Sequence, residues 1–103
     1  MSFIQTKSIN SNLLAKAYNL KTVAKEDLHD SFESFKNSFE RMEESMMMLV
    51  NHTSYNNVAK CVIRIEHDIN NEHYYNLKID IDELIFSLEE IINNEKSYLS
   101  NIF

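Results

Sequence analysis

The chain has 103 residues, 44% of them hydrophobic and 25% charged, with a formal net charge of −6, one cysteine, and no glycine, proline or tryptophan. This length indicates a single domain covering residues 1–103, and the composition excludes disordered, collagen-like and disulfide-stabilised chains. Membrane insertion is not expected, because no apolar run approaches the roughly 18 residues of a membrane span. Several large enzyme classes are not expected either, because their phosphate loops and nucleophile elbows require glycine.

The N-terminal part of the chain differs in charge from the rest. Up to Lys25 it carries four lysines and no acidic residue, whereas the remaining residues carry six basic and 16 acidic side chains. Such an asymmetry predicts that the N-terminal part either meets an acidic partner or packs on the protein's own acidic body. We interpret residues 1–10 as an arm or a leader, and we predict a short helix over residues 11–20.

A long amphipathic helix is predicted over residues 23–50. Its apolar positions step alternately by four and three residues, which is a heptad pattern with no helix breaker inside it. Thr22 precedes it as a candidate N-cap, and the polar residues 51–57 end it. Because the apolar stripe is narrow, this helix needs another helix beside it, in the same chain or in a second copy. The heptad positions are Leu28, Phe32, Phe35, Phe39, Met42, Met46 and Leu49.

Residues 58–81 fit two different periods. One apolar series has helical spacing, whereas two others alternate in the manner of strands. We favour a β-hairpin, because β-branched and aromatic residues are enriched and because Asn71 is able to take the left-handed position of a short loop. A helical hairpin is the alternative. The helical series is Val58, Val62, Ile65 and Ile69, and the alternating series are Ala59, Cys61, Ile63 and Ile65, then Tyr75, Leu77, Ile79 and Ile81.

The last predicted element is a helix that begins at Asp80 or Asp82 and continues to residue 102. The predicted fold class is therefore α+β and helix-dominated, with a short N-terminal helix, a long amphipathic helix, a β-hairpin and a C-terminal helix. An all-α four-helix bundle is the alternative. Because an isolated two-stranded sheet is marginal in water, the hairpin would have to lie on the helices or pair across the axis of a homodimer.

No residue pattern indicates catalysis, and we expect neither enzymatic activity nor a cofactor. Cys61 lies in an apolar run, where a small buried thiol is the ordinary role. Four polar residues near the predicted hairpin loop could gather a metal ion, but their spacing matches no established zinc pattern, which favours solvated loop polarity. These four residues are His67, Asp68, Glu72 and His73. The sequence therefore predicts no catalytic, cofactor-binding or metal-binding residue.

The composition favours binding of another protein. We expect a small acidic cytoplasmic protein that acts as an inhibitor, chaperone, immunity or anti-defence protein by occluding a partner with a basic surface. Abundant Asn, Ile and Lys suggest an origin in a phage or mobile element. The acidic body disfavours direct nucleic-acid binding but permits an alternative function as a nucleic-acid mimic that blocks a DNA- or RNA-binding channel. The predicted partner-binding residues are Met47, Met48, Tyr74, Glu40, Glu43 and Glu44.

Overall fold

The computed structural model describes the backbone of residues 2–49 and 52–102 and the side chains of residues 11–41 and 55–93. These residues form four α-helices and one short 3-10 helix, and the described part of the chain contains no strand. In chain order the elements are α1 (Ser2–Thr22), η1 (Lys25–Asp27), α2 (Leu28–Leu49), α3 (His52–Asn70) and α4 (Tyr74–Ile102).

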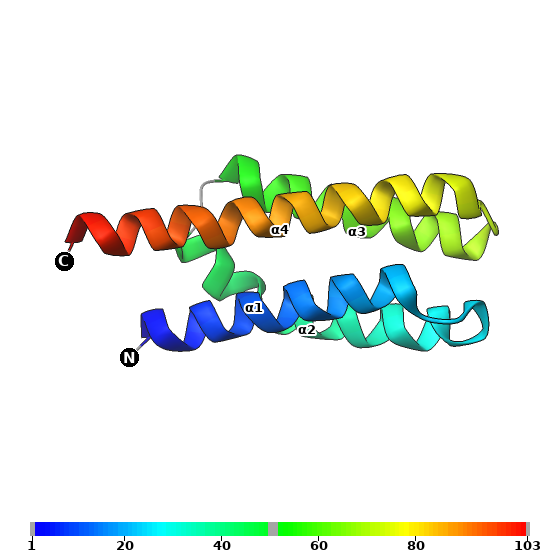
Figure 1. The fold of residues 1–103 in the computed structure, drawn as a ribbon, viewed down its shortest axis with the longest axis horizontal. Coiled ribbons are helices and arrows are strands. Elements are labelled where there is room, and N and C mark those ends of the chain that lie inside the picture. Colours follow the sequence, from blue (N-terminus) through cyan, green and yellow to red (C-terminus); the bar gives the residue numbers. More distant parts are fainter. Residues whose placement is uncertain (1, 50–51, 103) are drawn as a thin grey trace.

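The helices form an antiparallel bundle in which each packs against two neighbours, in the order α1, α2, α3, α4 and back to α1. Successive helices run in opposite directions, so the α1–α2 and α3–α4 connections lie together at one end of the bundle, on the right in Figure 1. The bundle is elongated, with principal extents of 46 × 21 × 21 Å. None of the described helices combines the length and apolar character that crossing a membrane requires.

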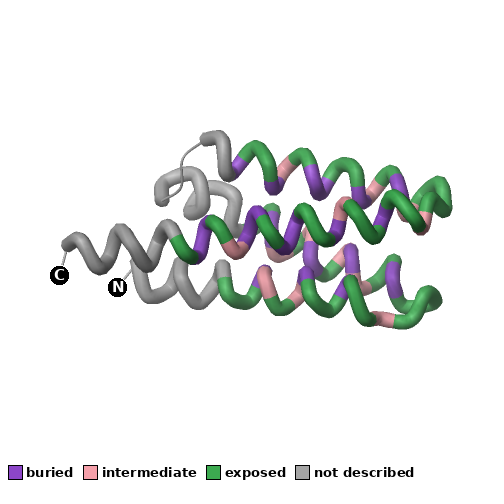
Figure 2. Tube along the Cα trace, turned by 45° about the horizontal axis from the view of Figure 1, so that its top comes forward, coloured by how far each residue is buried: buried purple, intermediate pink, exposed green. Residues whose placement is uncertain are grey.

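The core consists of the apolar side chains that each helix turns toward the bundle axis (Figure 2). In α2, Phe32, Phe35 and Phe39 are buried, as the heptad pattern predicts. Phe39 also stacks on Tyr55 of α3, with 5.9 Å between the ring centroids. Burying a large apolar side chain stabilises a fold by about 1.5–3 kcal/mol, so this stripe holds α2 in the bundle. The heptad positions whose side chains lie outside the described residues are Met42, Met46 and Leu49.

The predicted β-hairpin is wrong, and with it the α+β fold class, because residues 58–70 belong to α3 and residues 74–81 to α4. The all-α bundle alternative fits the structure. The helical series of α3 is the buried one: Val58 and Ile65 are fully inaccessible, whereas Ile63 of the alternating series is 69% exposed. The alternation arose because some apolar residues of these helices face solvent. They are Ile63, Tyr75 and Ile79.

Several helix ends also differ from the predicted ones. Thr22 is the last residue of α1 and not an N-cap, and η1 separates it from α2. The final helix begins at Tyr74, so Asp80 and Asp82 lie inside it. Residues 2–10, interpreted as an arm or a leader, belong to α1. A common physical reason is that the chain contains no proline or glycine to stop a helix, so capping signals alone are poor guides to the boundaries.

The turn between α3 and α4 closes as a Schellman motif. The amide of Glu72 donates to the carbonyl of Ile69 at 3.3 Å, and the amide of His73 donates to the carbonyl of Asp68 at 2.9 Å. Glu72, with φ of 57°, takes the left-handed conformation that the sequence assigned to Asn71. The motif thereby fixes the backbone of His73 against the end of α3.

Candidate functional site

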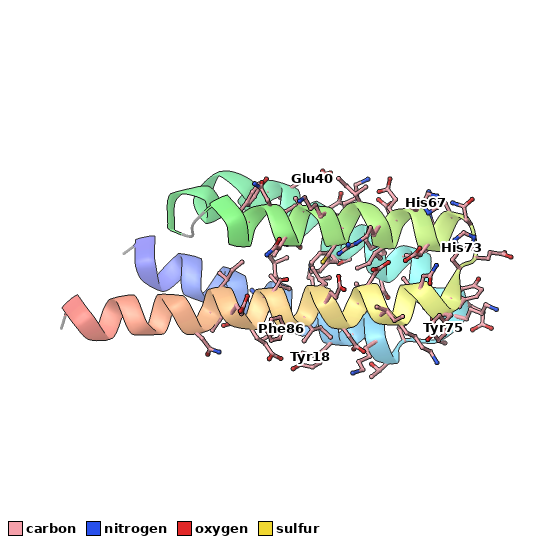
Figure 3. The ribbon with its side chains drawn as sticks, turned by 90° about the horizontal axis from the view of Figure 1, so that it is seen from above. Tyr18, Glu40, His67, His73, Tyr75 and Phe86 are labelled. Carbon is pink, nitrogen blue, oxygen red and sulfur yellow. The ribbon has the colours of Figure 1, made fainter. Side chains whose placement is uncertain are left out.

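Three large apolar side chains stand exposed in a row along α4. Tyr75 is 79% exposed, Ile79 45% and Phe86 62%. Their spacings of four and seven residues place them on one line of the helix surface, opposite the line that holds the fully buried Leu84 and Leu88. We call Tyr75, Ile79 and Phe86 the α4 ridge; Tyr75 and Phe86 are labelled in Figure 3. A row of exposed apolar side chains indicates an interaction surface more strongly than isolated ones do.

Two hollows lie between α3 and α4, and both are lined by Arg64 and Ile79. The larger has a volume of about 670 Å³ and reaches Phe86, and the smaller has a volume of about 390 Å³. Arg64 Nη2 donates to Glu83 Oε2 at 2.6 Å, and Arg64 Nε lies 3.5 Å from Asp80 Oδ1. The guanidinium is therefore held against α4, in the wall that the two hollows share.

Carboxylates lie within and beside the α4 ridge, and Asp82 occupies the position of the same row between Ile79 and Phe86. Asp82 pairs with Lys21 of α1 at 3.0 Å, and Glu83 pairs with Arg64 of α3. Glu90 lies one helical turn beyond Phe86 and is exposed. The ridge thus combines apolar contact area with neighbouring ion pairs and the exposed carboxylate of Glu90.

Two titratable groups near Arg64 are perturbed by their surroundings. Burial, together with a side-chain interaction with Asp68, raises the pKa of Asp80 to about 6, and the charge of Arg64 opposes this shift only in part. Burial also raises the pKa of the Cys61 thiol, although Arg64 Nη2 lies 3.4 Å from its sulfur and acts in the opposite direction. The thiol is buried, as its apolar run predicts, and it stays protonated near neutral pH.

His67, Asp68 and His73 converge at the turn between α3 and α4. One potential ligand atom of each lies within 4.8 Å of the others, and the two imidazole centroids are 5.8 Å apart (Figure 3). Both histidines are exposed, but Asp68 is only 5% exposed. Its Oδ2 atom is buried and accepts no hydrogen bond. Glu72, which the sequence placed in the same group, is not among the converging residues.

The predicted partner-binding residues do not gather at one place in the described part of the chain. Glu40 is exposed on α2, away from the α4 ridge (Figure 3). Tyr74 is half-buried, with Lys25 Nζ 4.0 Å from its ring centroid, and the exposed aromatic residue of the pair is Tyr75. The predicted residues whose side chains lie outside the described ones are Met47, Met48, Glu43 and Glu44.

Ile79 and Phe86 were not predicted from the sequence as surface residues. Ile79 was placed in an alternating strand series, and Phe86 was not singled out within the predicted C-terminal helix. A signal for both existed, because a single helix over residues 74–102 places them on the face opposite its buried leucines. The strand interpretation of residues 75–81 concealed this signal for Ile79, whereas Phe86 already lay inside the predicted C-terminal helix.

Comparison of the chain with family models, with curated proteins and with solved structures finds no match.

Proposed function

We propose that this chain is a protein-binding module that occludes its partner, in the manner of an inhibitor, chaperone, immunity or anti-defence protein. The observation that carries the proposal is the α4 ridge, in which three large apolar side chains are exposed in one row. Fully burying a side chain of this kind contributes about 1.5–3 kcal/mol of favourable free energy. Because the fold leaves these side chains partly exposed, a bound partner would gain part of this free energy.

The chemistry of the ridge favours an amphipathic helix as the docking segment of the partner. Side chains at four- and seven-residue spacing match the apolar row of a second helix laid along α4. The hollow beside Phe86 has room for a large side chain from that helix. Because the exposed Glu90 lies one turn beyond Phe86, a lysine or arginine next to the partner's apolar row would complement it and accelerate association.

A nucleic-acid mimic is the alternative function. Mimicry requires carboxylates that stay free to imitate phosphates, yet several described carboxylates already pair with basic side chains of a neighbouring helix. These pairs are Lys21 with Asp82, Lys36 with Glu66, and Arg64 with Glu83. Mimicry also gives no reason for an exposed apolar row. The protein-binding function therefore accounts for more of this surface.

The test compares the proteins captured by the wild type with those captured by a ridge variant, Ile79→Ser with Phe86→Ser. Both tagged proteins are exposed to nuclease-treated lysate of the source organism, and the retained proteins are identified by mass spectrometry. Truncating a central interface residue commonly costs about 2 kcal/mol or more, which is roughly 30-fold in affinity, so we expect the ridge variant to lose the partner. A Tyr18→Ser control removes an exposed aromatic side chain from α1 and should retain it.

The melting temperature of the ridge variant should fall by only a few degrees, because Phe86 is 62% and Ile79 45% exposed. The melting temperature of Tyr18→Ser is measured as well, since Tyr18 Oη donates a hydrogen bond to Glu89 of α4. Retention of the same partner by the ridge variant would contradict the proposal. Release of the captured protein by short DNA or RNA duplexes would favour the mimic. If the wild type captures only further copies of the same chain and the ridge variant does not, the partner is a second copy and not a foreign protein.

A further inference from the structure

We infer that His67, Asp68 and His73 form a binding site for one divalent transition-metal ion, with Zn²⁺ as the ion that fits best. The site lies at the turn between α3 and α4 and is independent of the proposed partner-binding function. From the sequence these residues, with Glu72, were considered as a metal cluster, but solvated loop polarity was favoured because their spacing does not follow that of known zinc motifs.

The backbone of the turn brings the ligands together. The hydrogen bond from the His73 amide to the Asp68 carbonyl, 2.9 Å long, fixes the start of α4 against the last turn of α3. His67 adjoins Asp68 in the chain, and its ring centroid lies 5.8 Å from that of His73. In a tetrahedral zinc site the ligand atoms are about 3.3 Å apart. The potential ligand atoms of the three residues lie within 4.8 Å of one another. Rotation of the two exposed imidazoles can bring them to the shorter distance.

The buried oxygen of Asp68 is a second, independent observation. An ionised carboxylate can only accept hydrogen bonds, and a buried acceptor without a donor costs about 1–3 kcal/mol. Asp68 Oδ2 is buried and has no hydrogen-bond partner among the described residues. Arg64 lines the same hollow, but its guanidinium is engaged by Asp80 and Glu83. A metal ion would supply the positive contact that this oxygen lacks.

The ligand set selects the class of metal. Imidazole nitrogen suits zinc, copper, iron and nickel, whereas calcium and magnesium prefer ligand sets made of oxygen alone. Two imidazoles and one carboxylate leave a coordination position for water, next to the hollow of about 390 Å³ that His67 and Asp68 help to line. A bound ion would also tie the beginning of α4 to the end of α3. Metal binding should therefore stabilise the bundle.

Zinc binding is measured on the purified full chain after removal of metals with a chelator. Competition with a chromophoric chelator should show one Zn²⁺ per chain. The melting temperature should rise with Zn²⁺ concentration, because an ion that binds only the folded state stabilises it in proportion to ln(1 + [L]/Kd). Mg²⁺ at the same concentration should produce no rise. Co²⁺ should produce visible absorption without the thiolate band that coordination by Cys61 would add.

Three variants and one control distinguish this site from weak surface binding. His67→Ala and His73→Ala each remove an exposed ligand and should weaken Zn²⁺ binding about tenfold or more, with an unchanged melting temperature in chelator. Asp68→Asn keeps the shape of the side chain and should weaken binding as well. His29→Ala removes an exposed histidine of α2 and should leave the affinity unchanged.

The inference is overturned if the wild type binds no stoichiometric Zn²⁺. It is equally overturned if the double variant His67→Ala with His73→Ala keeps the wild-type affinity, because the ion would then bind elsewhere.

Discussion

Glu72 is the described non-glycine residue with a positive φ, 57°, and it occupies the position of the Schellman motif where glycine is preferred. A side chain with a Cβ atom costs about 1–2 kcal/mol in the left-handed conformation. The charge of Glu72 lies between the C-terminal end of α3 and the N-terminal end of α4, whose dipoles act on it in opposite directions. The turn is therefore formed at a local energetic cost, which the packing of α3 against α4 offsets.

Glu72→Gly should accordingly raise the free energy of unfolding by about 1 kcal/mol, because it removes the backbone strain of the left-handed conformation. Chemical denaturation followed by circular dichroism at the helical band measures the change. Asn71→Gly is the matched control in the same turn. It should lower stability, since Asn71 Nδ2 donates to the His67 carbonyl at 2.8 Å and its φ is not positive. A gain of stability in the control and not in Glu72→Gly would refute this account of the turn.

At the scale of the elements, the success of the sequence analysis depended on which faces are apolar. The heptad stripe of α2 was predicted correctly from Leu28 to Phe39, because its apolar residues in this stretch are buried and its flanking residues are polar. In α3 and α4, Ile63, Tyr75 and Ile79 are apolar but exposed, and they add a period of two to a helical pattern. Periodicity reports which positions are apolar. It predicts which positions are buried only where no apolar residue faces solvent.

The same residues explain how much of the candidate site was predictable. Tyr75 and Ile79 belong to the α4 ridge, so the feature that misled the fold prediction is the one that carries the proposed function. The histidine cluster could be noticed in the sequence as neighbouring polar residues, but its convergence could not, because it depends on the conformation of Glu72 in the turn. The burial of Asp68 was equally inaccessible, since it depends on contacts between helices.

A pair of adjacent substitutions tests the helical assignment of residues 58–70. Val62→Asp buries a carboxylate in the core, where an unpaired charge costs several kcal/mol, so it should unfold the protein or lower its stability by about 3–5 kcal/mol. Ile63→Asp places the same group at a position that is 69% exposed and should change stability by less than about 1 kcal/mol. Thermal unfolding of both variants measures the difference. A larger loss of stability in Ile63→Asp than in Val62→Asp would be expected if these residues formed a β-hairpin.

At the scale of the whole molecule, the charge asymmetry of the chain is accommodated within the fold. Lys16 Nζ of α1 donates to Ser34 Oγ at 3.1 Å and to Ser38 Oγ at 2.6 Å, both on α2. Lys21 of the same helix pairs with Asp82 of α4. For these two lysines, packing on the protein's own body is therefore confirmed. The basic helix α1 lies between two acidic neighbours and reduces the repulsion between them.

These ionic contacts orient the helices but should contribute little to stability, because the pairs that join helices are partly or largely exposed and solvent screens them. We therefore expect the melting temperature to change by less than about 5 °C between about 0.05 M and 1 M NaCl. Leu84→Ala, which opens a cavity at a fully buried position of α4, should instead cost about 2–5 kcal/mol and lower it by roughly 10 °C or more. Calorimetry under both salt conditions measures the two effects. A fall in high salt as large as that caused by Leu84→Ala would mean that ion pairs, and not the apolar core, hold the helices together.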